Sequence, residues 1–213
     1  MRTLIAVPCM DMMHTRFVSS LLSLEMSSGD EVRFGASSLV YDTRNQLATY
    51  AIENSFDRIL WIDSDMTFGP EILAYLNEDL DKGCGIVSGL CFKRKPPCTP
   101  VIYDRCGFEQ LDDGKLDLVY RVYTEYPQDS LFEVAASGFG CVMVNVSVIK
   151  DMTSKAGSML FTPMAGFGED LSFCLRARMA EHKIWCDSRV KLGHIGEMVF
   201  DENYYKGLNN GTS

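Results

Sequence analysis

Hydrophobic and polar residues alternate with two different periods along the first half of this chain. Short apolar runs, typical of buried strands, predict strands at residues 3–7, 31–36, 58–62 and 86–88. Segments with apolar residues three or four positions apart predict amphipathic helices between them, at residues 14–26, from 42 or 43 onward, and 70–80. A repeated strand–helix order predicts a parallel, right-handed, doubly wound sheet, and so an α/β fold.

The pattern in the second half is less regular and adds antiparallel elements. Further strands are expected at residues 101–103, 133–137, 141–146 and 183–186, a hairpin turn at 111–116 and a helix at 169–181. The sequence therefore predicts one domain over residues 1–200, with a mainly parallel central sheet flanked by helices and a small antiparallel elaboration. Residues 201–213 show no core pattern and are expected to form a mobile tail.

Composition restricts the class of protein. The chain has 213 residues, 46% hydrophobic and 23% charged, which is ordinary for a globular domain. A net charge of −9 argues against a nucleic-acid groove, which needs a basic face. No apolar run approaches the roughly 18–20 residues that a membrane span requires, so no transmembrane anchor is expected and the location is interpreted as cytoplasmic.

Eight cysteines are present, and none forms a C-x-x-C pair. Several lie in apolar runs, which favours free, buried thiols in a reducing compartment. The alternative is a zinc site built from Cys91, Cys98 and Cys106, although this spacing fits no familiar zinc motif.

The predicted strand at residues 58–62 ends directly in two carboxylates, Asp63 and Asp65, separated by Ser64. Adjacent acids at the end of a buried strand are costly unless a cation or several hydrogen-bond donors compensate them. Ligands of parallel α/β sheets bind beyond the carboxyl ends of the strands. We therefore expect the pair to hold a divalent ion and, through it, a phosphate. The alternative is that the acids only cap the turn before Pro70.

Two later motifs carry further candidate chemistry. Glu169 and Asp170 open a predicted helix after a glycine-rich approach, where a carboxylate can act as a general base. Acids at a helix N-terminus are also favoured by the helix dipole alone. His194 lies between two glycines after a strand, and a neutral imidazole is a suitable ligand for Mn²⁺ beside carboxylates.

The ordered set of motifs resembles one enzyme family. A strand followed by D-S-D, then G-F-G before an apolar strand, then G-E-D opening a helix, then G-H, is similar to GT-A nucleotide-sugar glycosyltransferases, and most to the family-2-like members of bacteria and phages. The resemblance extends over roughly residues 3–200. It implies a Mn²⁺- or Mg²⁺-dependent transfer of a sugar from a nucleoside-diphosphate donor, UDP- or GDP-linked, to an acceptor hydroxyl.

The resemblance also implies roles for individual residues. Asp65 would bind the metal directly, and Asp63 would contact the ribose or reach the metal through water. His194 would complete the protein ligands, with diphosphate oxygens and water filling the remaining positions. Asp170 would deprotonate the acceptor and Glu169 would orient it. A base in this position favours inversion at the anomeric carbon.

Other residues are assigned with an alternative for each. In the resembling family, the segment that begins with Pro8 lines the nucleotide, so Asp11 would contact the base or ribose, or else cap a helix. Arg44 would hold the diphosphate, or pair with a nearby acid. The basic residues 93–95 would bind phosphate or an acidic acceptor, or form a solvated loop. Residues 138–140 would let backbone approach the donor sugar, or form a bulge.

Two other functions are compatible with the same motifs. A sugar-phosphate nucleotidyltransferase shares the sheet and the metal-bound nucleotide, but usually has a glycine-rich basic signature after the first strand, where this chain has Pro8 followed by Cys9, Met10 and Asp11. A non-catalytic GT-A-like binding module is the third possibility, and the intact acids weigh against it.

Overall fold

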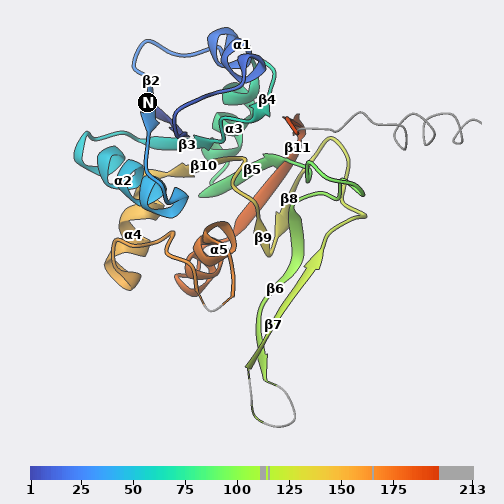
Figure 1. Cartoon of the computed structure of the whole chain (residues 1–213). Helices are drawn as coiled ribbons and strands as arrows, with labels where there is room; N and C mark the ends of the chain where they lie inside the picture. Colours follow the sequence, from blue (N-terminus) through green and yellow to red (C-terminus); the bar gives the residue numbers. More distant parts are fainter. Residues whose placement is uncertain (111–113, 115, 165, 197–213) are drawn as a thin grey trace, which may run out of the picture.

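The computed structural model describes residues 1–110, 114, 116–164 and 166–196. Its centre is a seven-stranded sheet in the order β2-β1-β3-β10-β5-β11-β8 (Figure 1). The strands are β1 (Thr3–Pro8), β2 (Glu31–Gly35), β3 (Arg58–Ile62), β5 (Ile86–Leu90), β8 (Leu131–Val134), β10 (Cys141–Asn145) and β11 (Ile184–Lys191).

Helices cover both faces of this sheet. In Figure 1, α1 and α3 lie above it, whereas α2, α4 and α5 lie below. Their bounds are α1 (Thr15–Ser23), α2 (Val40–Glu53), α3 (Ile72–Asp81), α4 (Val146–Ala156) and α5 (Glu169–Met179). Side chains of a strand point alternately to the two faces. Leu4 and Ala6 of β1 accordingly belong to the core between the sheet and helices α2, α4 and α5. Ile5 and Val7 belong to the core between the sheet and helices α1 and α3.

The predicted α/β fold with a mainly parallel sheet is confirmed, with two strands, β10 and β8, reversed. β1 pairs in parallel with β2 and β3, and β5 in parallel with β11. β10 lies between β3 and β5 and is antiparallel to both. The edge strand β8 is also antiparallel to its neighbour β11. The sheet is therefore mixed, because segments of the second half insert into and extend the parallel framework of the first.

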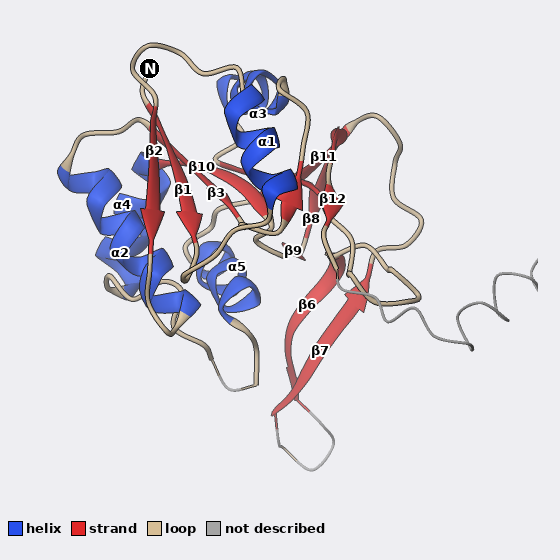
Figure 2. Cartoon of the chain, turned by 45° about the horizontal axis from the view of Figure 1, so that its top comes forward, coloured by secondary structure: helices blue, strands red, loops and turns tan. Residues whose placement is uncertain are grey.

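Two small antiparallel sheets complete the described structure. β6 (Ile102–Gln110) pairs with β7 (Leu116–Val122) as a long hairpin that projects from the body, and with β9 (Ala136–Ser137) (Figure 2). β4 (Met66–Thr67) pairs with β12 (Gly193–His194). The second of these pairings joins segments that are far apart in the sequence, and it builds part of the site.

Several predicted boundaries were wrong for local reasons. The first helix is shorter than residues 14–26, because the backbone becomes extended at Leu24. Neither Asp42 nor Thr43 caps α2, which begins at Val40 after an extended Leu39. Helix α4 was missed, because β10 runs into it without a turn residue between them. The strand expected at 133–137 is split at Ala135 between β8 and β9, which belong to different sheets.

The structure leaves two sequence predictions untested and adds one finding. Most of the predicted hairpin turn at 111–116 and the whole tail at 201–213 lie outside the described residues. In the part of the chain that is described, no helix has the length and apolar character needed to cross a membrane.

Candidate active site

The two acids Asp63 and Asp65 follow the buried central strand β3, as expected from the sequence. All five residues of β3 are buried, and the Asp63 backbone N–H donates to the Gly140 carbonyl at 3.1 Å, extending the contact with the segment before β10. The Met66 N–H donates to the Asp63 carbonyl at 3.1 Å, which turns the chain into β4. This turn holds both carboxylates at the edge of the sheet where ligands of α/β folds bind.

Pairing of β4 with β12 brings His194 to Asp65. His194 lies opposite Met66, and the Ile195 N–H donates to the Asp65 carbonyl at 2.7 Å. The His194 Nε2 atom is 3.2 Å from Asp65 Oδ2. Its Nδ1 atom is 2.8 Å from the Phe92 carbonyl. Since a carbonyl only accepts, Nδ1 carries a proton, and in the neutral imidazole the Nε2 lone pair faces the carboxylate.

A carboxylate oxygen and an imidazole lone pair that face one another form a suitable donor set for Mn²⁺ or Mg²⁺. Asp65 and His194 would hold such an ion, with Asp63 two residues away along the chain. Among the described residues, no group of three or more His, Cys, Asp and Glu side chains is arranged to hold a metal. That result includes Cys91, Cys98 and Cys106, and all eight cysteines are free. The remaining ligands would have to come from a diphosphate and water.

Arg94 is a second partner of Asp65. Its Nη1 atom donates to Asp65 Oδ2 at 2.7 Å, the same oxygen that faces His194. Arg94 belongs to the basic segment 93–95, which the sequence left open between phosphate binding and a solvated loop. The loop after β5 therefore positions both partners of Asp65, Arg94 through its side chain and His194 through the Phe92 carbonyl.

Arg44 is buried beside Asp63 at the first turns of α2. Only 2% of its side chain is exposed, and Nη2 donates to Asp63 Oδ1 at 2.8 Å. Its Nε atom is 3.8 Å from Glu169 Oε1, and the guanidinium lies 5.3 Å from the centre of the Phe139 ring. Nε and Nη1 have no hydrogen-bond partner in the described part of the chain. Because the side chain lines the cavity and is almost fully buried, Arg44 contributes a positive charge that favours an anionic ligand there.

Glu169 and Asp170 form the first turn of α5, where the helix dipole favours negative charge. Asp170 Oδ1 accepts a hydrogen bond from the Leu171 N–H at 2.7 Å. Burial, and then the charge of Glu169, raise the pKa of Asp170 to about 6, against the opposing effect of Arg44. Burial also raises the pKa of Asp63, and the charge of Arg44 lowers it. A carboxylate with a pKa near 6 is ionised at neutral pH and still accepts a proton readily.

An aromatic cluster fixes α5 against β3. Trp61 of β3 packs edge-on against Phe161 and Phe173, with ring centres 5.0 and 6.2 Å apart. Phe139 lies 5.7 Å from Trp61 and 4.9 Å from Phe173. These buried rings tie the strand that ends in Asp63 to the helix that begins with Glu169 and Asp170.

Residues 138–140 are held in place by close packing. A side chain at Gly138 would lie 2.7 Å from Val101 Cγ1, and one at Gly140 would lie 3.1 Å from Cys91 Sγ. The position of Gly138 is also 3.6 Å from Asp170 Oδ2. Their lack of side chains lets the Phe139 loop fit between β3, the segment before β6 and α5.

A cavity of about 570 Å³ joins most of the predicted site residues. Ligand pockets are typically of this size, on the order of 300–1,000 Å³. Pro8, Arg44, Asp63, Asp65 and Glu169 line it. His194 and Asp170 are not among the lining residues; His194 contacts the lining residue Asp65, and Asp170 follows the lining residue Glu169 in α5.

Asp11 does not join this group. It is exposed, and it is absent from the cavity lining although Met10 and Met12 belong to it. Its alternative role as a helix cap is wrong, since α1 begins at Thr15 and His14 occupies the N-cap position.

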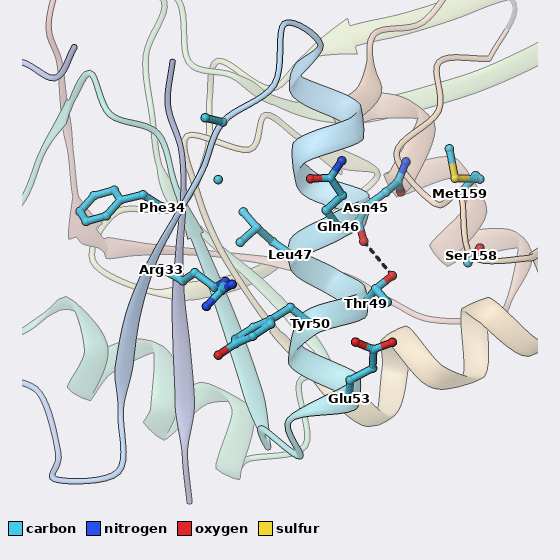
Figure 3. Close-up of a pocket in the computed structure, with 12 residues that line it drawn as sticks. Arg33, Phe34, Asn45, Gln46, Leu47, Thr49, Tyr50, Glu53, Ser158 and Met159 are labelled. Carbon is cyan, nitrogen blue, oxygen red and sulfur yellow. Dashed lines mark hydrogen bonds between the residues drawn. The ribbon is translucent and has the colours of Figure 1, made fainter. Parts of the chain in front are cut away.

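A second cavity, of about 490 Å³, lies between the edge strand β2 and α2 (Figure 3). Arg33, Gln46, Tyr50 and Glu53 contribute to its lining, and the Thr49 hydroxyl donates to the Asn45 carbonyl there at 3.1 Å. It contains none of the acids that follow β3 or open α5. The chemistry expected from the sequence is therefore concentrated in the other cavity.

Comparison with known proteins supports the fold alone. No family model and no curated protein matches this sequence. Among solved structures, the chain is similar to the crystal structure of A197 from STIV, with a TM-score of 0.64 over 92% of this chain and 87% of that chain. The two sequences are 14% identical, so the similarity extends to the α/β architecture, and function has to be argued from the residues of the site.

Three residues that line the cavity were missed from the sequence. Ser37 and Ser38 follow β2, and His14 precedes α1. The position of the serines after the carboxyl end of a parallel strand was an available signal. The pairing of Arg94 with Asp65 had no sequence signal, because it depends on how the loop after β5 folds over β4 and β12.

Proposed function

We propose that this chain is a metal-dependent glycosyltransferase that moves a sugar from a nucleoside-diphosphate donor, UDP- or GDP-linked, to an acceptor hydroxyl. The observation that carries the proposal is the contact of His194 with Asp65 at a cavity also lined by Asp63, Arg44 and Glu169. Two types of metal-binding group and a buried, under-satisfied guanidinium thus surround one space of ligand size. Such a space suits an anionic ligand that arrives with a divalent ion.

The two acids that follow β3 would have different roles in binding the donor. Asp65 and His194 would hold Mn²⁺ or Mg²⁺, which, when bound, stabilises the negative charge that develops on the leaving diphosphate. Asp63 is held by Arg44 on the buried side, where it is suited to the ribose or to a water on the ion. The buried positive charge of Arg44, at the wall of this cavity, would favour the negative charge of a diphosphate.

Acceptor activation is assigned to Asp170. A sugar hydroxyl is a weak nucleophile, and a positioned carboxylate that removes its proton typically contributes ~10²–10⁴-fold in rate. The raised pKa of Asp170 suits it to receive that proton, and Glu169 beside it would orient the acceptor. The proton leaves the acceptor oxygen for Asp170 as that oxygen bonds to the anomeric carbon and the donor diphosphate departs. Attack from the face opposite the leaving group inverts the anomeric carbon.

Thermal unfolding with UDP or GDP, each with and without Mn²⁺, tests the proposal. A ligand present at about 100 times its dissociation constant adds roughly 2.7 kcal/mol, which raises the Tm of a chain of this size by roughly 5–10 °C. We expect that rise only with nucleotide and Mn²⁺ together, and its loss in Asp65→Ala. Asp117→Ala, which changes an exposed acid on the projecting hairpin, is the matched control and should keep it. A chain that no nucleotide stabilises, or an Asp65→Ala variant that responds like the wild type, would refute the metal site.

A further inference from the structure

Asp65 Oδ2 has two partners of different kinds. The Arg94 guanidinium donates to it at 2.7 Å, and His194 Nε2 faces it at 3.2 Å. Of these two partners, Arg94 carries a permanent positive charge and donates a charge-assisted hydrogen bond to this oxygen. Arg94 thus occupies the role that a metal ion would take at the same atom.

Arg94 also lies between two cavities. It lines the site cavity of about 570 Å³, and it lines a neighbouring cavity of about 360 Å³ together with Lys95, Ile195 and Gly196. His14 is the other residue common to both linings. A movement of the Arg94 side chain would therefore change both spaces at once.

The backbone under Arg94 is held, whereas its side chain has freedom. The preceding Lys93 N–H donates to the Thr99 carbonyl at 2.9 Å. A side chain at Gly196 would lie 3.1 Å from the Arg94 carbonyl oxygen, so the two segments are closely packed. The Arg94 side chain itself is 54% exposed. A long, half-exposed side chain on a fixed backbone can exchange one anionic partner for another at small cost.

A divalent ion held by Asp65 and His194 would compete with the Arg94 guanidinium for the negative charge of Asp65 Oδ2. An ion coordinated by Asp65 and His194 would lie between these two groups, within a few ångströms of the Arg94 charge, where like charges repel strongly. This repulsion would weaken the contact of Arg94 with Asp65 and favour movement of its half-exposed side chain. The nearest new anion is then the diphosphate that the same ion binds, and arginine matches its oxygens with two parallel hydrogen bonds.

We propose that Arg94 is a resident counter-cation of Asp65 that competes with the metal ion in the empty site and becomes a diphosphate ligand once the metal and donor are bound. This inference rests on the proposed function and assigns Arg94 a role within it. It predicts that the affinities for two ligands, the metal ion alone and the nucleotide, change in opposite directions when Arg94 is substituted. Removing the guanidinium should improve binding of the metal alone and weaken binding of the nucleotide.

The test compares Arg94→Gln with the wild type in two titrations. Mn²⁺ alone is titrated with free Mn²⁺ measured by electron paramagnetic resonance, and UDP and GDP are then titrated calorimetrically at saturating Mn²⁺. We expect Arg94→Gln to bind Mn²⁺ alone about two- to fivefold more tightly, because a half-exposed ion pair contributes a few-fold to an equilibrium constant. The nucleotide should bind about tenfold or more weakly, since a charge-assisted hydrogen bond is lost.

Lys95→Gln is the matched control, because Lys95 lies next in the chain and carries the same charge without contacting Asp65. It should leave Mn²⁺ affinity within twofold of the wild type. Mn²⁺ affinity that is unchanged or weaker in Arg94→Gln, or an equal gain in Lys95→Gln, would overturn the competition. Unchanged nucleotide affinity would overturn the diphosphate role. A wild type that binds neither Mn²⁺ nor nucleotide overturns the proposed function itself, which separates the two failures.

Discussion

Burial and, after it, the charge of Glu169 raise the pH at which Asp170 can act as a base, and the contribution of Glu169 can be measured with an isosteric substitution. Burial and the Glu169 carboxylate raise the pKa of Asp170 from 3.8 to about 6. Glu169→Gln removes the charge and keeps the size of the side chain. Burial remains, so the Asp170 pKa in Glu169→Gln should lie below about 6 and above 3.8.

The wild-type pKa predicts a clear acid limb in the rate. With a pKa of about 6, roughly nine-tenths of Asp170 is ionised at pH 7 and roughly one-tenth at pH 5. The kcat/KM for the donor should therefore fall about tenfold between these pH values, since kcat/KM reports ionisations of the free enzyme. An Asp170 with its ordinary pKa of 3.8 would be more than about nine-tenths ionised at both pH values, and the rate would hardly change.

The assay follows release of nucleoside diphosphate from UDP- or GDP-sugars with water as the acceptor, at saturating Mn²⁺ and constant ionic strength from pH 4.5 to 8. We expect the midpoint of the acid limb near pH 6 in the wild type and at lower pH in Glu169→Gln. Asp170→Asn should lose the limb together with ~10²–10⁴-fold in rate, while keeping donor binding. A Glu169→Gln midpoint equal to or above that of the wild type would refute this account of Asp170.

Two further predictions concern the framework around the site. Gly193→Ala should weaken Mn²⁺ binding about tenfold or more, because a Cβ there would lie 2.3 Å from Thr67 Oγ1 and push His194 away from Asp65. Calorimetry should show that a second substitution, Thr67→Ala, restores much of the lost Mn²⁺ affinity. A double variant that binds Mn²⁺ no better than Gly193→Ala would contradict the steric cause. Asp79 is fully buried and, through burial and its hydrogen bond with Asp187, has a pKa raised to about 6. Its contribution to stability is therefore fully present below about pH 4 and lost as the pH rises through 6. The free energy of unfolding in urea should depend less on pH over that interval in Asp79→Asn than in the wild type, and equal dependence would refute the raised pKa of Asp79.

Local patterns in the sequence were sufficient for the framework that presents the site. The apolar run at residues 58–62 identified β3, and its abrupt end placed Asp63 and Asp65 at the ligand-binding edge. The glycine-rich approach followed by two acids correctly located the start of α5. These features are readable because burial of a strand and the first turn of a helix restrict residue types over a few consecutive positions.

The sequence by itself determined the α/β class, the order of the first strands and helices, and the identity of the three acids that line the cavity. Only the tertiary structure decided which side chains contact each acid: Arg44 contacts Asp63, and Arg94 and His194 contact Asp65. It also decided that β10 inserts antiparallel between β3 and β5, and that β12 crosses to β4. The physical reason is the distance along the chain over which each interaction acts. Periodicity and capping depend on a few consecutive residues, whereas Asp65 contacts Arg94 and His194 across 29 and 129 residues of chain. No local pattern of residues encodes such contacts.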